Sequence, residues 1–158
     1  MTKYPNLFSE GKIAGIRLKN KVVMPAMGTA LASESGEITD HQIAYYEERA
    51  RGGVGLIIAE TSPVENVFGK SDFVGPRIDE HRFIPMWYRL ANTIHKYDTK
   101  IFVQLQHAGR QSSSALTGGK QIVAPSPVAS DVIGETPREL TVEEIREIEN
   151  RFITAAMN

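Results

Sequence analysis

The strongest constraint on the fold is an order of elements that repeats along the chain. Short apolar runs, rich in β-branched and aromatic residues, alternate with longer segments whose apolar residues recur at helical spacing. The expected strands are Lys21–Ala26, Val54–Ala59 and Ile101–Gln106, and the expected helices cover 39–51, 84–97 and 141–158. This alternation predicts an α/β fold with a parallel sheet built from about three βα units.

A small hairpin is expected before the first of these strands. Lys12–Ile13 and Ile16–Leu18 are short apolar runs on either side of Ala14–Gly15, which has the composition of a tight turn. From there to Asn158 we find no internal repeat, low-complexity tract or linker. Residues 1–158 are therefore expected to form a single unit.

Helix starts are marked by capping signals. Thr39 is followed by Gln42, and Thr141 by Glu144, which is the spacing of a capping box. In the middle helix the apolar stripe includes Trp87, which predicts a core anchor and not a platform for a cofactor. In the last helix the residues expected on one apolar face are Val142, Ile145, Ile148, Phe152, Ile153 and Ala156.

Composition excludes several classes of protein. The net charge is −1 with both signs interspersed, which argues against binding to nucleic acid or an anionic membrane. The chain has no cysteine, so disulfides and thiolate metal sites are excluded, and its four histidines lack metal-ligand spacing. No run approaches the ~18 apolar residues of a membrane span, and the N-terminus lacks an apolar signal core. A cytoplasmic location is expected.

The stretch IFVQLQHAGR, residues 101–110, carries the most chemistry. An apolar strand ends there in Gln104, Gln106, His107 and Arg110. Gln104 offers one acceptor and two donors, which suits a flat heterocycle with alternating carbonyl and N–H groups, such as a flavin pyrimidine. The alternative is a strand-end amide bonded to neighbouring backbone. His107 has two corresponding alternatives, a structural hydrogen bond or a contact with flavin or substrate.

Small and polar residues follow the other two strands. Ala26–Thr29 is a loop of mostly small residues that would let a planar ligand approach the backbone. Glu60 and Thr61 lie at the carboxyl end of the second strand, where parallel α/β barrels keep their sites. Glu60 is expected to be a structural carboxylate bonded to backbone, and not a general acid or base.

Three segments in order resemble the Old Yellow Enzyme family of FMN-dependent NADH:flavin oxidoreductases. They are LKNKVVMPAM at 18–27, YYEERARGGVGLIIAE at 45–60 and QLQHAGR at 104–110. VAPS at 123–126 and ELTVEEI at 139–145 also fit, so the resemblance runs from Leu7 onward. It implies the N-terminal part of a (β/α)8 TIM barrel, with the hairpin plugging the bottom. A complete barrel has eight units in about 250 residues.

The resemblance also implies roles for single residues. Pro25, Ala26, Met27 and Gly28 would line one side of the FMN ring, although Met27 stands where relatives often have Cys or Thr. Thr61 would pack on the flavin, at a position that is usually Ala or Gly, and Gln104 would read the pyrimidine edge. Contacts with substrate fall on Thr29, His107 and Arg110.

The implied reaction passes hydride from NAD(P)H through FMN to an activated alkene of an enoate or enone. The proton donor is expected beyond Asn158, so this chain alone should lack activity and its own catalytic residues are unknown. Within the family, the sequence pattern is similar to that of the 2-enoate and 2,4-dienoyl-CoA reductases. Those enzymes add an iron–sulfur cluster and FAD in a longer protein.

Two other functions remain open. The chain could be a non-catalytic barrel fragment or subunit that acts in assembly without flavin, because open strand edges invite a homo-oligomer or a complementing chain. A small flavodoxin-like binder is a weaker alternative, because the segment PAMGTALASESG at 25–36 makes a poor phosphate loop.

Overall fold

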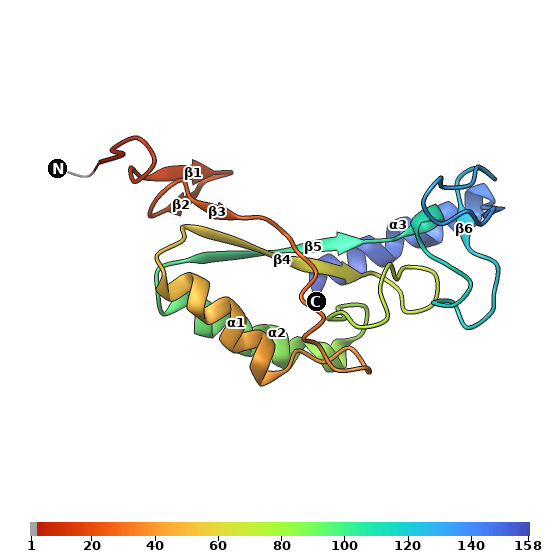
Figure 1. Ribbon diagram of the computed structural model, residues 1–158, viewed down its shortest axis with the longest axis horizontal. Coiled ribbons are helices and arrows are strands. Elements are labelled where there is room, and N and C mark those ends of the chain that lie inside the picture. The colour runs from red at the N-terminus through yellow and green to blue at the C-terminus, as the bar shows by residue number, and fades with distance from the viewer. Residues whose placement is uncertain (1–2) are drawn as a thin grey trace.

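The computed structural model describes residues 3–158 and confirms the three βα units. A parallel sheet has the order β3–β4–β5, and its strands span Val23–Met24, Leu56–Pro63 and Lys100–Gln106. The helices α1, α2 and α3 span Asp40–Arg51, Ile84–His95 and Val142–Met157. Helices α1 and α2 lie together on one side of the sheet, and α3 runs back along β5 (Figure 1).

The N-terminal hairpin is also confirmed. Strands β1 (Gly11–Ile13) and β2 (Ile16–Leu18) pair antiparallel around the predicted turn at Ala14–Gly15. Ala14 and Gly15 both have positive φ, 45° and 89°, as the two-residue turn that matches the twist of a hairpin requires.

The expected strand boundaries need correction. The first strand pairs only over Val23–Met24 and not over the whole of Lys21–Ala26, because Pro25 has no N–H to donate to the ladder. The second strand begins at Leu56 instead of Val54 and continues to Pro63, because its carboxyl end finds a long partner in β5. The helix expected over 84–97 ends at His95, before Asp98 turns the chain with a φ of 51°.

The capping signals are borne out at both helices, with one difference. In α3 the box is complete, because Thr141 Oγ1 accepts from the Glu144 N–H and Glu144 Oε2 accepts from the Thr141 N–H, at 3.2 and 2.8 Å. In α1, Thr39 Oγ1 accepts from the Gln42 N–H at 3.2 Å. The Gln42 side chain does not return to Thr39; its amide nitrogen donates to Glu60 instead.

The core lies between the sheet and the helices. From the sheet it contains Met24, Ile57 and Ala59, and from the helices Tyr46, Trp87, Leu90 and Ile94. On β5 the residues that pack against this core are Ile101, Val103 and Leu105. Since side chains alternate along a strand, Phe102, Gln104 and Gln106 point to the opposite face of the sheet.

Two elements depart from the sequence analysis. The segment between the third expected strand and the last expected helix contains β6 (Val123–Ala124), which pairs in parallel with β7 (Arg138–Glu139). The sequence analysis expected no strand there, because the paired residues are too far apart for local patterns to indicate. The expected apolar face of α3 is only partly covered. Ile145, Ile148 and Phe152 are half-buried, whereas Val142, Ile153 and Ala156 are exposed, because few described elements pack against this helix.

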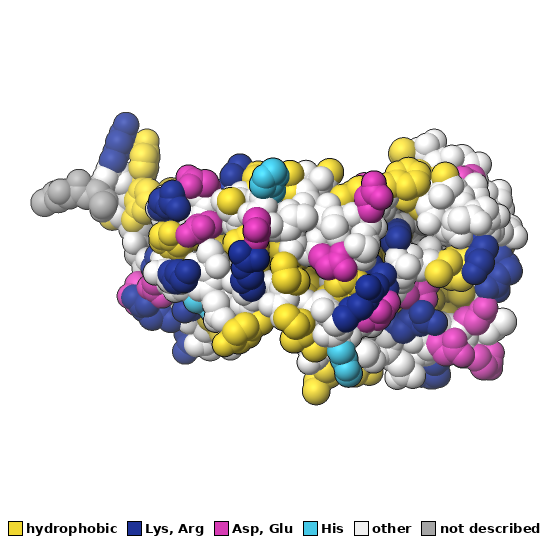
Figure 2. Space-filling model, turned by 90° about the horizontal axis from the view of Figure 1, so that it is seen from below, with side chains coloured by type: hydrophobic (Ala, Val, Ile, Leu, Met, Phe, Trp, Pro, Cys, Tyr) yellow, Lys and Arg dark blue, Asp and Glu magenta, His cyan; other side chains and the backbone are white. Residues whose placement is uncertain are grey.

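The surface carries no dominant charge. On the side of α1 and α2, basic and acidic side chains are interspersed between apolar ones (Figure 2). Among residues 3–158, no helix is both long and apolar enough to cross a membrane.

Candidate functional site

A β-bulge in β4 shapes the carboxyl end of the sheet. Ala59 pairs with Val103, and the next pair is Thr61 with Gln104, so Glu60 is an extra residue on its strand. If side chains alternated regularly from Ala59, Thr61 would share the face of Ala59 and point to the helix side. The bulge therefore places Thr61 directly opposite Gln104, on the sheet face that α1 and α2 leave uncovered.

Gln104 is exposed on this face. Its side chain lies on the side of the sheet away from the core, so it is not a buried amide. Its acceptor and donors are accessible to a ligand above the sheet. The chemistry that the residue type indicates is thus available at the position where Thr61 also lies.

The loop after β3 adds small residues beside this pair. Pro25, Met27 and Gly28 are exposed, and Ala26 is half-buried. Gly28 and Thr61 line the same cavity of about 270 Å³, together with Ala30, Glu60 and residues 72–75. The structure thus brings the loop and the strand end together, and a planar ligand could approach the backbone there.

The Glu60 carboxylate is bonded within the protein. Its side chain is buried, Oε2 accepts a hydrogen bond from the Thr29 N–H at 2.5 Å, and Oε1 accepts one from Gln42 Nε2 at 2.5 Å. The expected structural carboxylate bonded to backbone is therefore confirmed. Thr29 itself is half-buried and its backbone is held by this contact.

His107 faces a carboxylate that the sequence analysis did not single out. The side chains of His107 and Glu65 are each only 8% exposed, and Nε2 lies 3.6 Å from Glu65 Oε1. His107 Nδ1 accepts from the Gly109 N–H at 3.3 Å, so in the neutral ring the proton is on Nε2, toward Glu65. The geometry favours the structural alternative for His107.

Glu65 joins three segments of the chain. It accepts from the Phe68 N–H at 2.9 Å and forms an ion pair with Arg151 of α3. Burial raises the pKa of Glu65, but His107 and then Arg151 outweigh burial, so the pKa is lowered below its ordinary value. Only long-range contacts assemble this cluster, and no local signal marked Glu65.

Arg110 lies apart from the cavity beside Thr61. It belongs to a 3₁₀ turn, Gly109–Gln111, and its side chain is exposed. Among the described residues, those that line that cavity do not include Arg110 or His107.

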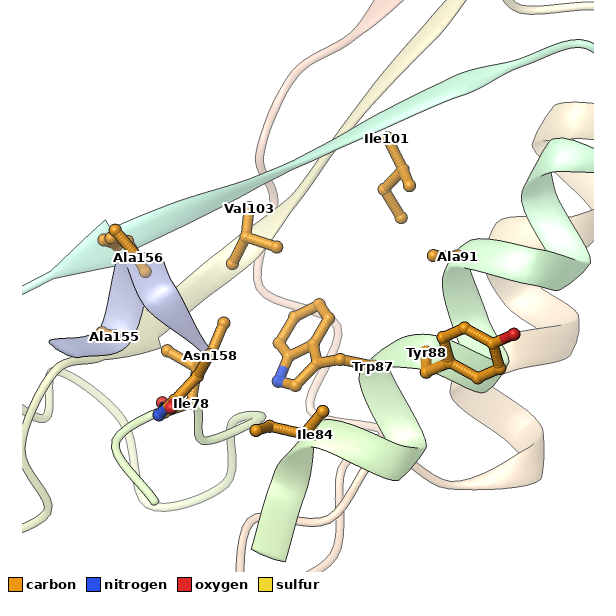
Figure 3. A pocket seen from close by; sticks show the side chains of 11 residues that line it. Ile78, Ile84, Trp87, Tyr88, Ala91, Ile101, Val103, Ala155, Ala156 and Asn158 are labelled. Atoms are coloured by element: carbon orange, nitrogen blue, oxygen red, sulfur yellow. Dashed lines mark hydrogen bonds between the residues drawn. The ribbon is translucent and has the colours of Figure 1, made fainter. Parts of the chain in front are cut away.

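An apolar cavity lies on the other side of the sheet. It measures about 480 Å³ and lies between α2, the end of α3 and the core-facing side of β5, with Trp87 at its centre (Figure 3). Trp87 Nε1 donates to the Arg77 carbonyl at 2.8 Å, and the residue belongs to the core as expected. Among the described residues, this cavity is not lined by Glu60, Thr61, Gln104 or His107.

The residues at the carboxyl edge fit a flavin ring and not a metal. Within 3–158, no group of three or more His, Cys, Asp or Glu side chains is placed to hold a metal ion. The exposed Gln104 amide, its neighbour Thr61 and the small residues of the loop offer a polar edge and a flat approach. These are the groups that a heterocycle with carbonyl and N–H edges requires.

Glu65→Gln is expected to lower the free energy of unfolding at pH 7 by about 1–2 kcal/mol, because the charge that pairs with Arg151 is lost. The folded-state pKa lies below the ordinary value of 4.5, so the carboxylate stabilises the fold above that pH. This stabilisation disappears as the pH falls through the folded-state pKa. Denaturant unfolding at several pH values should show the two proteins converging in acid.

The control for this variant is Glu48→Gln, which alters an exposed ion pair with Arg51 on α1 and should change stability little. A Glu65→Gln deficit that stayed constant down to pH 3 would contradict the assigned electrostatic role.

Comparison with known proteins assigns the chain to a family. The sequence profile of the NADH:flavin oxidoreductase / NADH oxidase family matches residues 6–158. An NADH oxidase of Thermoanaerobacter brockii is 47% identical over 157 residues, which are 99% of this chain and 24% of that protein. An NADPH dehydrogenase of Listeria monocytogenes is 40% identical over 152 residues, 95% of this chain and 43% of that protein.

The fold agrees with these relatives. The structure of the Old Yellow Enzyme homologue from Zymomonas mobilis superposes with a TM-score of 0.85 and 26% identity, covering 96% of this chain and 44% of that one. The described fold is thus the first part of a (β/α)8 barrel with its N-terminal hairpin. The chain spans between about a quarter and less than half of these relatives. From this match and this fold, the chain belongs to the NADH:flavin oxidoreductase / NADH oxidase family, as an N-terminal part.

Proposed function

We propose that this chain supplies one wall of an FMN site, as the N-terminal portion of an FMN-dependent oxidoreductase. The observation that carries the proposal is the Thr61–Gln104 pair on the uncovered sheet face, beside the loop 25–29. Polar groups at the carboxyl ends of adjacent parallel strands are where barrels of this type hold their ligands.

Each residue has a task in this site. Gln104 would donate to and accept from the pyrimidine edge of the ring, since its amide has both functions. Pro25, Ala26, Met27 and Gly28 would cover one side of the ring, and Thr61 would contact it from β4. Bound FMN would supply hydride transfer from NAD(P)H to the activated alkene of an enoate or enone, while these residues bind and orient the ring.

The proposal also includes contacts with the substrate. Thr29 lies in the loop beside the cavity, so it is best placed to meet a small unsaturated carbonyl compound. His107 is held against Glu65, and Arg110 is exposed in the 3₁₀ turn, so either would reach a substrate only from the side of β5.

We further propose that residues 1–158 act as one incomplete FMN-binding barrel unit within a larger assembly, and that this unit by itself is inactive. We also propose that the chain belongs to the branch of 2-enoate and 2,4-dienoyl-CoA reductases. This is supported by the small share of the NADH oxidase that the chain spans. An iron–sulfur cluster and FAD would be held elsewhere in such a protein, because this chain has no cysteine.

The test is a titration of the purified chain with FMN, followed by flavin fluorescence. Saturable quenching is expected, because the ring would stack on the loop and the sheet face. The matched ligand is riboflavin, which has the same ring without the phosphate and should bind with similar affinity to a site that reads the ring. If neither ligand binds, the chain does not build the proposed wall.

A second candidate function is assembly without flavin. The observation in its favour is that β3 and β5 are edges of the described sheet and that α3 exposes Val142 and Ile153. Sedimentation of the flavin-free chain distinguishes the two, because an assembly role predicts a defined oligomer whose mass does not depend on FMN.

A further inference from the structure

The bulge at Glu60 is stabilised from helix α1. The Glu60 N–H donates to Tyr46 Oη at 3.0 Å, so it is satisfied by a side chain below the sheet. Tyr46 is itself fully buried, and burial raises the pKa of its hydroxyl, which keeps it neutral as a hydrogen-bonding group. The backbone of Glu60 is thus fixed independently of its carboxylate.

The carboxylate connects two further segments. Glu60 is 2% exposed, and its two oxygens accept from the Thr29 N–H and from Gln42 Nε2. Thr29 lies in the loop that follows β3, and Gln42 lies in the first turn of α1. One side chain of β4 therefore holds the backbone of the loop beside the candidate flavin site.

Stability does not explain this arrangement well. A buried carboxylate is costly unless its hydrogen bonds are made, and burial raises the pKa of Glu60, with the Thr29 contact acting in the opposite direction. Within residues 3–158, the buried Gln42 Oε1 has no hydrogen-bond partner, which adds to the cost. An apolar side chain of similar volume would avoid the cost of the buried carboxylate, but it could accept neither from Thr29 nor from Gln42 Nε2.

The backbone of the loop after β3 is held in one conformation. Ala30, directly after Thr29, has a φ of +54°, which a residue with a Cβ adopts only when its surroundings impose it. The Leu31 N–H donates to Thr29 Oγ1 at 3.2 Å, and Thr39 Oγ1 donates to the Leu31 carbonyl at 2.5 Å. The Glu60 contact ties this loop to the sheet.

We propose that Glu60 is a positioning residue, whose carboxylate fixes the loop 25–29 over the carboxyl end of the sheet while the bulge turns Thr61 toward Gln104. Its consequence for the cofactor rests on the proposed FMN site. Glu60 touches neither the ring nor the substrate in this proposal and acts through the Thr29 backbone.

The test compares Glu60→Leu with Glu60→Gln by amide hydrogen exchange. Glu60→Leu removes the acceptor for Thr29 and should speed exchange in peptides that cover 25–31 by at least tenfold. Glu60→Gln keeps one acceptor oxygen and should restore protection to within about threefold of the original chain. The control is Glu48→Leu, an exposed position on α1, which should leave this segment unchanged.

Flavin titration of the same variants separates this inference from the proposed function. If the original chain binds FMN, Glu60→Leu should weaken binding about tenfold and Glu60→Gln should restore it. Unchanged exchange over 25–31 in Glu60→Leu would overturn the positioning role, whether or not FMN binds. Faster exchange with no FMN binding by the original chain would support the loop anchor while the proposed function fails.

A measurement on the unmodified chain covers the case in which Glu60→Leu does not fold. The Thr29 amide proton should resonate downfield and shift as Glu60 titrates, at a pH above the ordinary range of Glu because the pKa is raised. Asp72, which lines the same cavity, is the other nearby carboxylate, so the titration is repeated in Asp72→Asn. A Thr29 resonance that does not respond to Glu60 would overturn the proposal.

Discussion

Ile57→Ala is expected to lower the free energy of unfolding by about 2–5 kcal/mol, the range for removing a large aliphatic side chain from a packed core. Ile57 is 0% exposed and lies in the central strand, between Met24 on β3 and Ile101 on β5. It packs into the cluster that α1 and α2 close from the other side. The neighbouring strands are fixed by their ladders, so the cavity should collapse only partly.

Denaturant unfolding followed by circular dichroism measures this loss. The matched control is Ile153→Ala on α3, where the side chain is 61% exposed, and it should stay within about 0.5 kcal/mol of the original chain. A loss below 1 kcal/mol for Ile57→Ala would show that the three-stranded sheet is not packed in solution as described.

Gln104→Leu is expected to weaken FMN binding by roughly 10- to 100-fold, because it leaves polar groups at the edge of the ring without partners. Leucine has a similar size and retains the strand, and position 104 is exposed on the uncovered face of the sheet. Stability should therefore change by no more than about 0.5 kcal/mol. This combination of a large effect on affinity and a small effect on stability is specific to a ligand contact.

The measurement is the FMN titration with thermal unfolding run in parallel. Gln121→Leu provides the same substitution at an exposed position just before β6, where the side chain contacts the Thr136 carbonyl, and it should bind FMN as the original chain does. Equal affinity of Gln104→Leu and Gln121→Leu would remove Gln104 from the site.

The sequence was enough to predict where most residues of the candidate site lie in the fold. Gln104 and Thr61 both come at the ends of apolar runs, and parallel strands place such ends at one edge of a sheet. The backbone contact of Glu60 was also within reach, because a carboxylate at a buried strand end needs partners. The uncovered position of Gln104 was not, because exposure depends on which elements cover a given face.

Elements with strong local signals were determined by the sequence itself. The hairpin turn, the three helices and the three strands follow from turn composition, capping residues and apolar spacing, which act between residues close in the chain. The capping box of α3, with Thr141 and Glu144, formed as predicted for the same reason.

Only the tertiary structure decided the features that depend on partners distant in sequence. The bulge at Glu60 is defined by how β4 pairs with β5. The Gln42 side chain does not complete the expected capping box, because it donates to the neighbouring Glu60 carboxylate instead. Glu65, His107 and Arg151 meet across three elements, and the pairing of β6 with β7 joins residues 15 positions apart in register. Local patterns record the preference of each segment, whereas these contacts depend on how the segments pack, which no single segment encodes.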